Sequence, residues 1–435
     1  IGAFALDGET VRVFVNHELW RDAGPTYDIG ELQVVGARIS VFDIDRATRE
    51  VRAAGIAYDR VYDRISRIAQ TASQISEQTE IPNAGFSRFC SGQGVRAGTF
   101  GLVDDIYFVP EEVKQGAHRF GGSVWALDVA TSALWAVPAM GRGVWENVTP
   151  LDTGNPDMEA FLLADDFVEA PLILYVGNIE HGSEKFLNRN GLADGRLYTW
   201  VADDGARTPD DFAGNGAVQA GRFVPLPPSR MSRPRRMRAK ASGAFLFSRP
   251  EDVATDPANG QRAVLASTGG NTFAADRWGT TYLVDVEFGE DWATIPATLT
   301  ILYDGDETGD EGLRNPDNLD WGDDGIITVQ EDRAERVGPF GRSSGREASI
   351  WRLDPETGEA ERIAEMNRAA APDDPEADDI GNWESSGVLD VTDLFETAPG
   401  ETLLLATVQA HSLLGGKIEE HKLVQGGQII WLSRP

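Results

Sequence analysis

Short polar segments rich in carboxylates follow or interrupt the apolar strands that the chain predicts. They are Asn16-His17-Glu18, Cys90-Ser91-Gly92, Pro110-Glu111-Glu112, Ser248 to Asp252, Asn315 to Leu319, Gln330 to Arg333, Glu384 to Gly387 and Gln409 to Ser412. Each segment could lie at a strand end and face a common channel. Carboxylate oxygens suit hard cations such as calcium. One thiolate, with an imidazole, adds a site for a transition metal.

Each of these residues also has an ordinary structural explanation. A lone cysteine such as Cys90 is usually a small buried hydrophobe. Glu18 can be a charge at a strand end, and Arg249 and Glu251 can be a simple ion pair around Pro250. His411 follows the apolar strand 403–408, so a ligand role and a buried, hydrogen-bonded role are equally open. The segments carry an argument only when taken together.

The sequence lacks the motifs of several other classes of protein. The chain has no Walker loop and no G-x-G-x-x-G opening a helix, so neither nucleotide-binding fold is supported. It has no C-x-x-C, and its single cysteine cannot form a disulfide within the chain. A formal charge of −31 repels phosphate backbones, so we expect no nucleic-acid partner. No apolar run of about 18 residues is present, so we expect no membrane span.

The elements that must position these residues recur along the chain. A short alternating strand, an Asp or turn residue and a second strand appear at residues 38–43, 123–128, 196–201, 281–285 and 349–354, and a similar strand lies at 428–432. Period-two alternation predicts half-buried strands. About six such hairpins predict an all-β, single-domain β-propeller over residues 1–435, with long inserted loops. We expect the strand near Trp431 to pair with the first blade and close the ring. A pair of β-sandwiches is the alternative.

Two segments depart from the β pattern. Apolar residues at helical spacing between Val61 and Ile75 predict one helix over about 57–79, packed on the propeller. Residues 225–240 gather five arginines and one lysine with four prolines, and we expect an exposed basic loop that pairs with the acidic surface.

The order of the polar segments resembles that of the PhoX-type alkaline phosphatase family. The matching motifs are Asn-His-Glu (16–18), Cys-x-Gly followed by Gly-Thr and Glu-Glu (90–112), Gly-Arg then Trp-Glu-Asn (141–147), Ser-Arg-Pro-Glu-Asp (248–252), Pro-Asp-Asn-Leu (316–319), Glu384 before Gly387, and Gln409 with His411. The resemblance runs from about residue 10 to about residue 415. Ser-Arg-Pro-Glu-Asp and the segment from Cys90 to Glu112 are its most specific parts.

The resemblance implies a β-propeller with calcium and iron, or manganese, in the mouth of its channel. By motif, it implies that Cys90 is a thiolate ligand, that Glu251 is a bridging carboxylate and that Arg249 contacts the substrate phosphate. The other metal ligands that it implies are Glu18, Glu112, Glu180, Asp317, Glu384 and His411. Glu180 is the nearest glutamate after Gly177, where the family has a metal-binding glutamate. Asn16 and Asn318 are expected to contact the substrate.

These parts together predict a metal-dependent phosphoester hydrolase acting on a small-molecule phosphomonoester, with Arg249 and Glu251 as catalytic residues. A metal cluster neutralises the phosphoryl oxygens and activates water. The alternatives are a phosphotriesterase-type or lactonase-type metal propeller and a non-catalytic calcium-binding propeller. An acidic surface, no internal disulfide and a start without a leader fit a periplasmic or secreted bacterial protein, and we expect that location.

Overall fold

Three hairpin turns in different parts of the chain are stabilised in the same way by an aspartate. Asp45 and Asp128 end a strand and Asp354 follows one, and the Oδ1 atom of each accepts hydrogen bonds from the backbone N–H groups two and three residues later. The fifth residue of each turn has a positive φ: Arg49, Ser132 and Gly358. The side chain of the aspartate therefore fixes the turn, as the sequence predicted.

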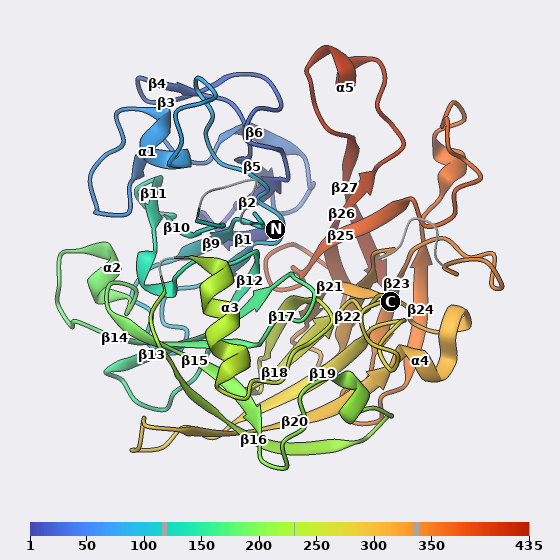
Figure 1. Cartoon of the computed structure of the whole chain (residues 1–435). Coiled ribbons are helices and arrows are strands. Elements are labelled where there is room, and N and C mark those ends of the chain that lie inside the picture. The colour runs from blue at the N-terminus through green and yellow to red at the C-terminus, as the bar shows by residue number, and fades with distance from the viewer. Residues whose placement is uncertain (115–119, 230, 334–338, 435) are drawn as a thin grey trace.

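Figure 1 shows the computed structural model, which describes residues 1–114, 120–229, 231–333 and 339–434. The strands form six blades around a common axis, a β-propeller. Blade 1 contains β1 (Gly2–Ala5), β2 (Thr10–His17), β5 (Arg38–Asp45) and β6 (Val51–Ile56). Blade 2 contains β8 (Gln93–Val95), β9 (Ile106–Pro110), β10 (Val124–Asp128) and β11 (Ala133–Ala136). Blade 3 contains β12 (Trp145–Leu151), β13 (Met158–Asp165), β14 (Ile173–Asn178) and β15 (Gly195–Ala202).

The second half of the ring repeats this arrangement. Blade 4 contains β17 (Pro250–Asp256), β18 (Asn259–Ser267), β19 (Thr280–Val286) and β20 (Ile295–Asp304). Blade 5 contains β21 (Pro316–Trp321), β22 (Ile327–Glu331), β23 (Ser349–Leu353) and β24 (Ala360–Glu365). Blade 6 contains β25 (Trp383–Asp390), β26 (Thr402–Ala410) and β27 (Gly426–Arg434). The predicted all-β propeller is thus confirmed.

Additional elements decorate the ring. Strand β7 (Arg60–Tyr62) pairs in parallel with β11, and β16 (Val218–Leu226) joins blades 3 and 4 by pairing with β15 and β20. Strands β3 (Tyr27–Ile29) and β4 (Leu32–Val34) form a small hairpin. The α-helices are short: α1 (Ala72–Ser76), α2 (Phe186–Arg189), α3 (Ser232–Ala241), α4 (Gly305–Thr308) and α5 (Lys417–Glu420). Of these, α5 lies in the connection between β26 and β27, which projects from the ring (Figure 1).

Apolar side chains between successive blades form the core, and they also close the ring. The expectation that the last strand pairs with the first blade is wrong. Strand β27 pairs with β26, and β1 pairs with β2. Blades 1 and 6 instead meet through buried side chains that include Val13, Phe395 and Leu405, with Trp431 packed against them. Burial of apolar area replaces strand pairing as the force that closes the ring.

The helix predicted over 57–79 is also wrong for most of that segment, since only Ala72–Ser76 is helical. Arg60–Tyr62 is a strand, and the carboxylate of Asp63 accepts hydrogen bonds from the backbone N–H groups of Ile65 and Arg67. Ser66 has a φ of 57°. This aspartate-stabilised turn competes with the helix, and it leaves Ile65 65% exposed.

The basic segment 225–240 is not an exposed loop. Strand β16 ends at Leu226, and α3 occupies Ser232–Ala241, while residue 230 lies outside the described residues. Pro234 lies in the first turn of α3, where a missing N–H group breaks no helical bond. Arg235 is fully buried and forms an ion pair with Asp165. The expected pairing with acidic groups therefore occurs inside the protein.

Within the part of the chain described, no helix is long and apolar enough to cross a membrane.

Candidate metal centre

The first strand of each blade lies next to the axis. In order around the ring, these strands are β1, β8, β12, β17, β21 and β25, and successive members contact one another. Between β25 and β1, Gly387 lies against Ile1. Side chains at equivalent positions of these strands are therefore brought close together around the axis.

One position recurs in five blades. Near the start of each first strand, one residue pairs with a residue at the end of the second strand. The pairs are Phe89–Glu111, Trp145–Asp165, Pro250–Ser267, Pro316–Glu331 and Trp383–Ala410. The residue after the first member of each pair has a side chain that can bind a metal: Cys90, Glu146, Glu251, Asp317 and Glu384.

A second set of polar side chains comes from the ends of the second strands. The residues that follow the second members of the same pairs are Glu112, Asp166, Thr268, Asp332 and His411. In blade 1, Glu18 follows the end of β2. Each blade therefore has polar side chains at adjacent strand ends, and these side chains lie at the same end of the ring.

Irregular pairing explains why these side chains leave the sheet. The register of the first two strands shifts immediately after the bridged pair in blades 3, 4 and 5. A bulge leaves the extra residues without a partner across the sheet and re-aims their side chains. Glu146, Glu251 and Asp317 lie at these bulges.

The two sets meet in a cavity of about 370 Å³. Among the described residues, its lining includes Cys90, His411 and eight carboxylates: Glu18, Glu112, Glu146, Asp166, Glu251, Asp317, Asp332 and Glu384. Their possible ligand atoms form four overlapping groups, and within each group all these atoms lie within 4.8 Å of one another. The groups are Glu18, Cys90 and Glu112; Glu112, Glu146 and Asp166; Glu146, Glu251 and Asp317; and Asp317, Asp332 and Glu384.

Burial and mutual repulsion raise the pKa values of most of these groups. Burial, with the neighbouring Asp166 and Glu18 and against the pull of Arg88, raises the pKa of Glu112 to about 8. Burial also raises the pKa values of Glu146, Asp317 and Glu384 well above their ordinary range. The same effect, with Glu146 and Glu18 nearby, raises the pKa of the Cys90 thiol. Among the described residues that line the cavity, carboxylates outnumber arginines, which is consistent with the raised pKa values.

Among the described residues, three arginines line the cavity and supply positive charge. Nε of Arg249 donates to Asp166 at 2.7 Å, and its Nη2 lies 2.6 Å from Glu251. This contact overcomes burial and lowers the pKa of Asp166. Arg88 pairs with Glu18 at 2.5 Å and with Glu112. Arg333 reaches the cavity edge and pairs with Asp379 at 2.5 Å.

The residues present fit a cluster of metal ions. Carboxylates predominate, as hard cations require, and one thiol adds a softer ligand. Oδ1 of Asp317 is buried and has no hydrogen-bond partner among the described residues, although Asp317 belongs to two of the four groups. A cation would satisfy this oxygen and displace the protons that the raised pKa values retain.

Comparisons with known proteins agree with the fold. The chain is similar to the solved structure of Pseudomonas fluorescens PhoX in complex with vanadate, a transition state analogue. The TM-score is 0.64 and the identity 15%, over 99% of this chain and 87% of that chain. Pseudomonas aeruginosa periplasmic gluconolactonase, PpgL, gives a TM-score of 0.36 at 10% identity, over 97% and 100% of the two chains. No protein-family model and no curated protein sequence matches the chain. The chain has a PhoX-like fold, and at this identity the likeness concerns the fold alone.

Most of the residues predicted as ligands come together in the acidic cavity. Glu18, Cys90, Glu112, Glu251, Asp317, Glu384 and His411 all line it, as does Arg249. Nε2 of His411 lies 3.4 Å from Glu384, and its Nδ1 lies 2.7 Å from Gln425. Glu180 is elsewhere: it is exposed, follows the end of β14 and accepts a hydrogen bond from Asn188 at 2.6 Å.

Asn16 and Asn318 lie beside the acidic cavity, in the wall of a neighbouring one. Nδ2 of Asn16 donates to the carbonyl of Ser91 at 2.7 Å, and Tyr107 donates to its Oδ1 at 3.0 Å. Oδ1 of Asn318 accepts the N–H of Gly387 at 2.8 Å. Both amides therefore hold the backbone near the site.

Asp166, Glu146 and Asp332 were not predicted as ligands, although their strands carry a recurring signal. A four-residue segment at the end of the second strand of each blade begins with an apolar residue and finishes, just beyond the strand, with a polar one. The segments are Val15–Glu18, Val109–Glu112, Leu163–Asp166, Leu265–Thr268, Val329–Asp332 and Val408–His411. Aligning these six segments would have found Asp166 and Asp332. The penultimate carboxylates support the backbone instead, as Glu111 does by accepting the N–H groups of Ser87 and Ser123.

Proposed function

We propose that the chain is a metal-dependent phosphoester hydrolase that acts on small phosphomonoesters. One observation carries the proposal: an acidic cavity on the propeller axis holds four overlapping groups of possible ligands together with the guanidinium of Arg249. The PhoX structure of similar fold was solved with vanadate, a transition state analogue. The order of the polar motifs supports the same chemistry.

Cys90, Glu18, Glu112, Glu146, Glu251, Asp317 and Glu384 would hold the metal ions. The carboxylates favour calcium, and the thiolate of Cys90 favours iron or manganese as a second kind of ion. When bound, such ions supply Lewis acidity toward phosphoryl oxygens and make a water-derived nucleophile available near neutral pH.

The chain itself supplies a clamp for the phosphoryl group. Asp166 and Glu251 hold Arg249 from one side, while its Nη1 has no hydrogen-bond partner among the described residues. A guanidinium held in this way can donate to two oxygens of a phosphoryl group without reorganising. Thr268 donates its hydroxyl to Oε1 of Glu251 at 3.0 Å and so fixes the orientation of that carboxylate. These contacts pre-organise the site before substrate arrives.

A serine hydrolase is a weaker alternative. Gly341-Arg342-Ser343-Ser344-Gly345 matches the G-x-S-x-G pattern of a nucleophile elbow. However, the N–H and hydroxyl of Ser343 donate to Asp310 at 2.7 and 3.0 Å. The segment is a turn, whereas an elbow joins a strand to a helix. Ser343 therefore serves to hold this loop.

The proposal is tested by assaying a chromogenic phosphomonoester, a phosphotriester and a lactone with the metal-loaded chain, with and without chelator. We expect chelator-sensitive hydrolysis of the monoester and at least a hundredfold loss in Asp317→Asn. Glu180→Gln is the matched control, since it removes an exposed carboxylate outside the cavity, and it should retain full activity. Turnover of the lactone or triester alone would contradict the proposal, as would bound calcium without any turnover.

A further inference from the structure

A second cavity of about 490 Å³ adjoins the acidic one, between blade 1 and blade 6. Strands β2 and β5 form one wall, and β26 and β27 form the other. Like most neighbouring blades of this ring, these two belong to separate sheets. The ring closure leaves a space that opens beside the candidate metal centre.

The two cavities share part of their lining. Glu18, Cys90, Val424 and Gln425 line both of them. Val424 and Gln425 precede β27, and the amide of Gln425 contacts His411 on the acidic side and Gln409 on the other. The two cavities are therefore adjacent, and the side chain of Gln425 lies at their boundary.

The chemistry of the two cavities differs sharply. The acidic cavity is lined mainly by carboxylates and guanidiniums. The second cavity is lined by apolar side chains, which include Val15, Leu19, Phe42, Val408, Leu423 and Ile429, together with uncharged polar ones and His17. Among its described lining residues there is no lysine or arginine, and Glu18 at the shared boundary is the only carboxylate. Its other polar side chains include Asn16, Thr407 and Gln428.

We propose that this second cavity, here called the apolar annex, binds the organic group of the substrate and selects for uncharged apolar groups. The inference rests on the proposed function. Glu18 and Cys90, two of the proposed metal ligands, line both cavities, so a phosphoryl group bound at the metal ions would have the annex next to it for an aryl or alkyl group. A space of this size suits a group larger than methyl. A second charged group would lose its hydration there without gaining a partner.

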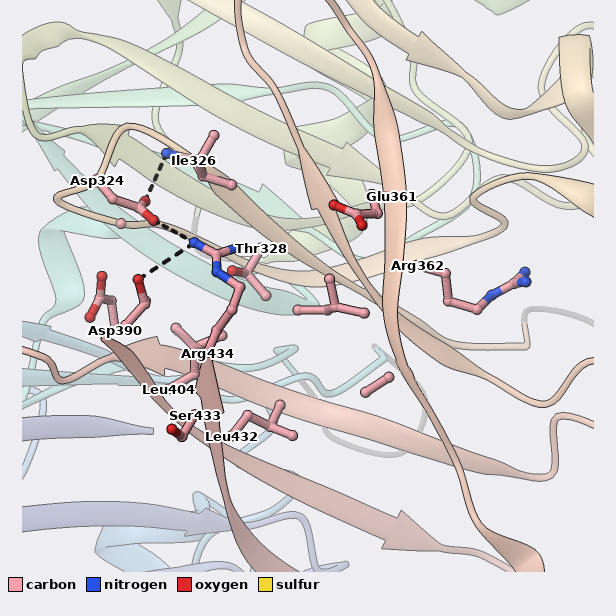
Figure 2. A pocket seen from close by; sticks show the side chains of 14 residues that line it. Asp324, Ile326, Thr328, Glu361, Arg362, Asp390, Leu404, Leu432, Ser433 and Arg434 are labelled. Atoms are coloured by element: carbon pink, nitrogen blue, oxygen red, sulfur yellow. Dashed lines mark hydrogen bonds and ion pairs between the residues drawn. The ribbon is translucent and has the colours of Figure 1, made fainter. Parts of the chain in front are cut away.

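Another inter-blade cavity, shown in Figure 2, provides a matched control. It lies between blades 5 and 6, and its lining includes Asp324, Leu404, Leu432 and Arg434. It shares no lining residue with the acidic cavity. Ile429 and Leu432 both belong to β27, but they line different cavities because an odd separation places them on opposite faces of the strand. The same truncation at both positions tests the annex alone.

The experiment compares hydrolysis of methyl, butyl and hexyl phosphate by the metal-loaded full chain. We expect kcat/KM to rise about fourfold for each methylene that enters the annex. Ile429→Ala should lower kcat/KM for hexyl phosphate about tenfold and leave methyl phosphate unchanged. Leu432→Ala should leave the chain-length dependence of the wild type intact. Binding of methylphosphonate and hexylphosphonate, measured by calorimetry, gives the same comparison without turnover.

The outcomes separate the two proposals. Hydrolysis that is independent of chain length, with equal affinities for the two phosphonates, would overturn the apolar annex and leave the proposed function standing. Failure to hydrolyse any ester would overturn the proposed function. The phosphonates would then decide the annex: tighter binding of hexylphosphonate that Ile429→Ala abolishes supports it, and equal binding overturns it.

Discussion

At the scale of single residues, Arg249 is held between two carboxylates that belong to different blades. Asp166 follows β13 and Glu251 lies in β17, and both pair with the guanidinium. Burial alone would lower the pKa of Arg249, but the two carboxylates raise it well above its ordinary value. The cation is therefore permanent, and its planar shape decides what it can bind.

Replacing Arg249 with lysine should lower kcat/KM for a phosphomonoester by about 10²- to 10³-fold, because an ammonium cannot donate in the same fork. The amount of bound metal should not change, since Arg249 is not a ligand. Steady-state kinetics and elemental analysis of the same preparation check both statements. Loss of metal in Arg249→Lys would show that the residue maintains the cluster and would refute its role as a phosphate clamp.

Asp276 gives a prediction on the pH dependence of stability. Burial raises its pKa to about 7, although the hydroxyl of Thr280, which donates to Oδ1 of Asp276 at 2.9 Å, opposes the shift. Because the folded protein holds this proton more tightly than the unfolded chain, the free energy of unfolding should fall as pH rises from about 4 to 7. The slope from this group is at most about 1.4 kcal/mol per pH unit.

Asp276→Asn should flatten the dependence of stability on pH across that window, as measured by urea unfolding between pH 4 and 8. The matched control is Asp28→Asn, which changes an exposed aspartate. It should leave the profile of the wild type in place. An unchanged profile in Asp276→Asn would contradict the assignment.

At the scale of elements, the sequence predicted the hairpin turns, but it did not predict the structures of the segments 57–79 and 225–240. The contacts that fix the turns at Asp45 and Asp354 are local in sequence, because the side chain of one aspartate holds the backbone of the next few residues. The strands beside these turns alternate with period two. The prediction of a helix over 57–79 was wrong because the carboxylate of Asp63 accepts backbone N–H groups of Ile65 and Arg67 and so stabilises a turn instead. The segment 225–240 failed because the partner of Arg235, Asp165, lies 70 residues away in sequence. Local patterns do not contain such contacts.

Arg235 in α3 should be essential for stability. It forms a fully buried pair with Asp165 and stacks on Trp145, with its guanidinium carbon 4.1 Å from the ring centroid. Arg235→Ala removes this stack and leaves the buried Asp165 with Arg236 as its remaining ion-pair partner among the described residues, so it should cost about 3 kcal/mol of unfolding free energy. Denaturant titration measures it. Lys240→Ala, which breaks an exposed pair with Glu169 in the same helix, should cost less than about 1 kcal/mol.

At the scale of the whole molecule, the ring brings side chains from equivalent positions of successive blades together at the axis, where they line one cavity. Cys90, Glu251, Asp317 and Glu384 were recognisable from their motifs, and they occupy one equivalent position in four blades. Asp166 belongs to no motif that was recognised, and its strand end is visible as a ligand position only when the six blades are aligned. Glu180, which was predicted from a nearby motif, lies outside the cavity.

The concentration of carboxylates on the axis also predicts how metal affects stability. Glu112, with a pKa of about 8, and its neighbours with raised pKa values are protonated at low pH and repel one another once ionised. The metal-free protein should therefore unfold at a lower temperature at pH 9 than at pH 6, and added calcium should restore more stability at pH 9. Calorimetry at both pH values, with and without chelator, checks this. Equal stabilisation by calcium at the two pH values would contradict the prediction.

The central claim is that the acidic cavity is a metal centre that hydrolyses phosphoesters. The most direct test is elemental analysis of the purified full chain and of Glu146→Gln, combined with a phosphomonoester assay before chelation, after it and after metal is restored. We predict calcium together with iron or manganese in the wild type, less metal in the variant, and activity that disappears and returns with the metal. A wild-type protein that binds no metal, or that hydrolyses the ester equally well after complete chelation, would contradict the claim.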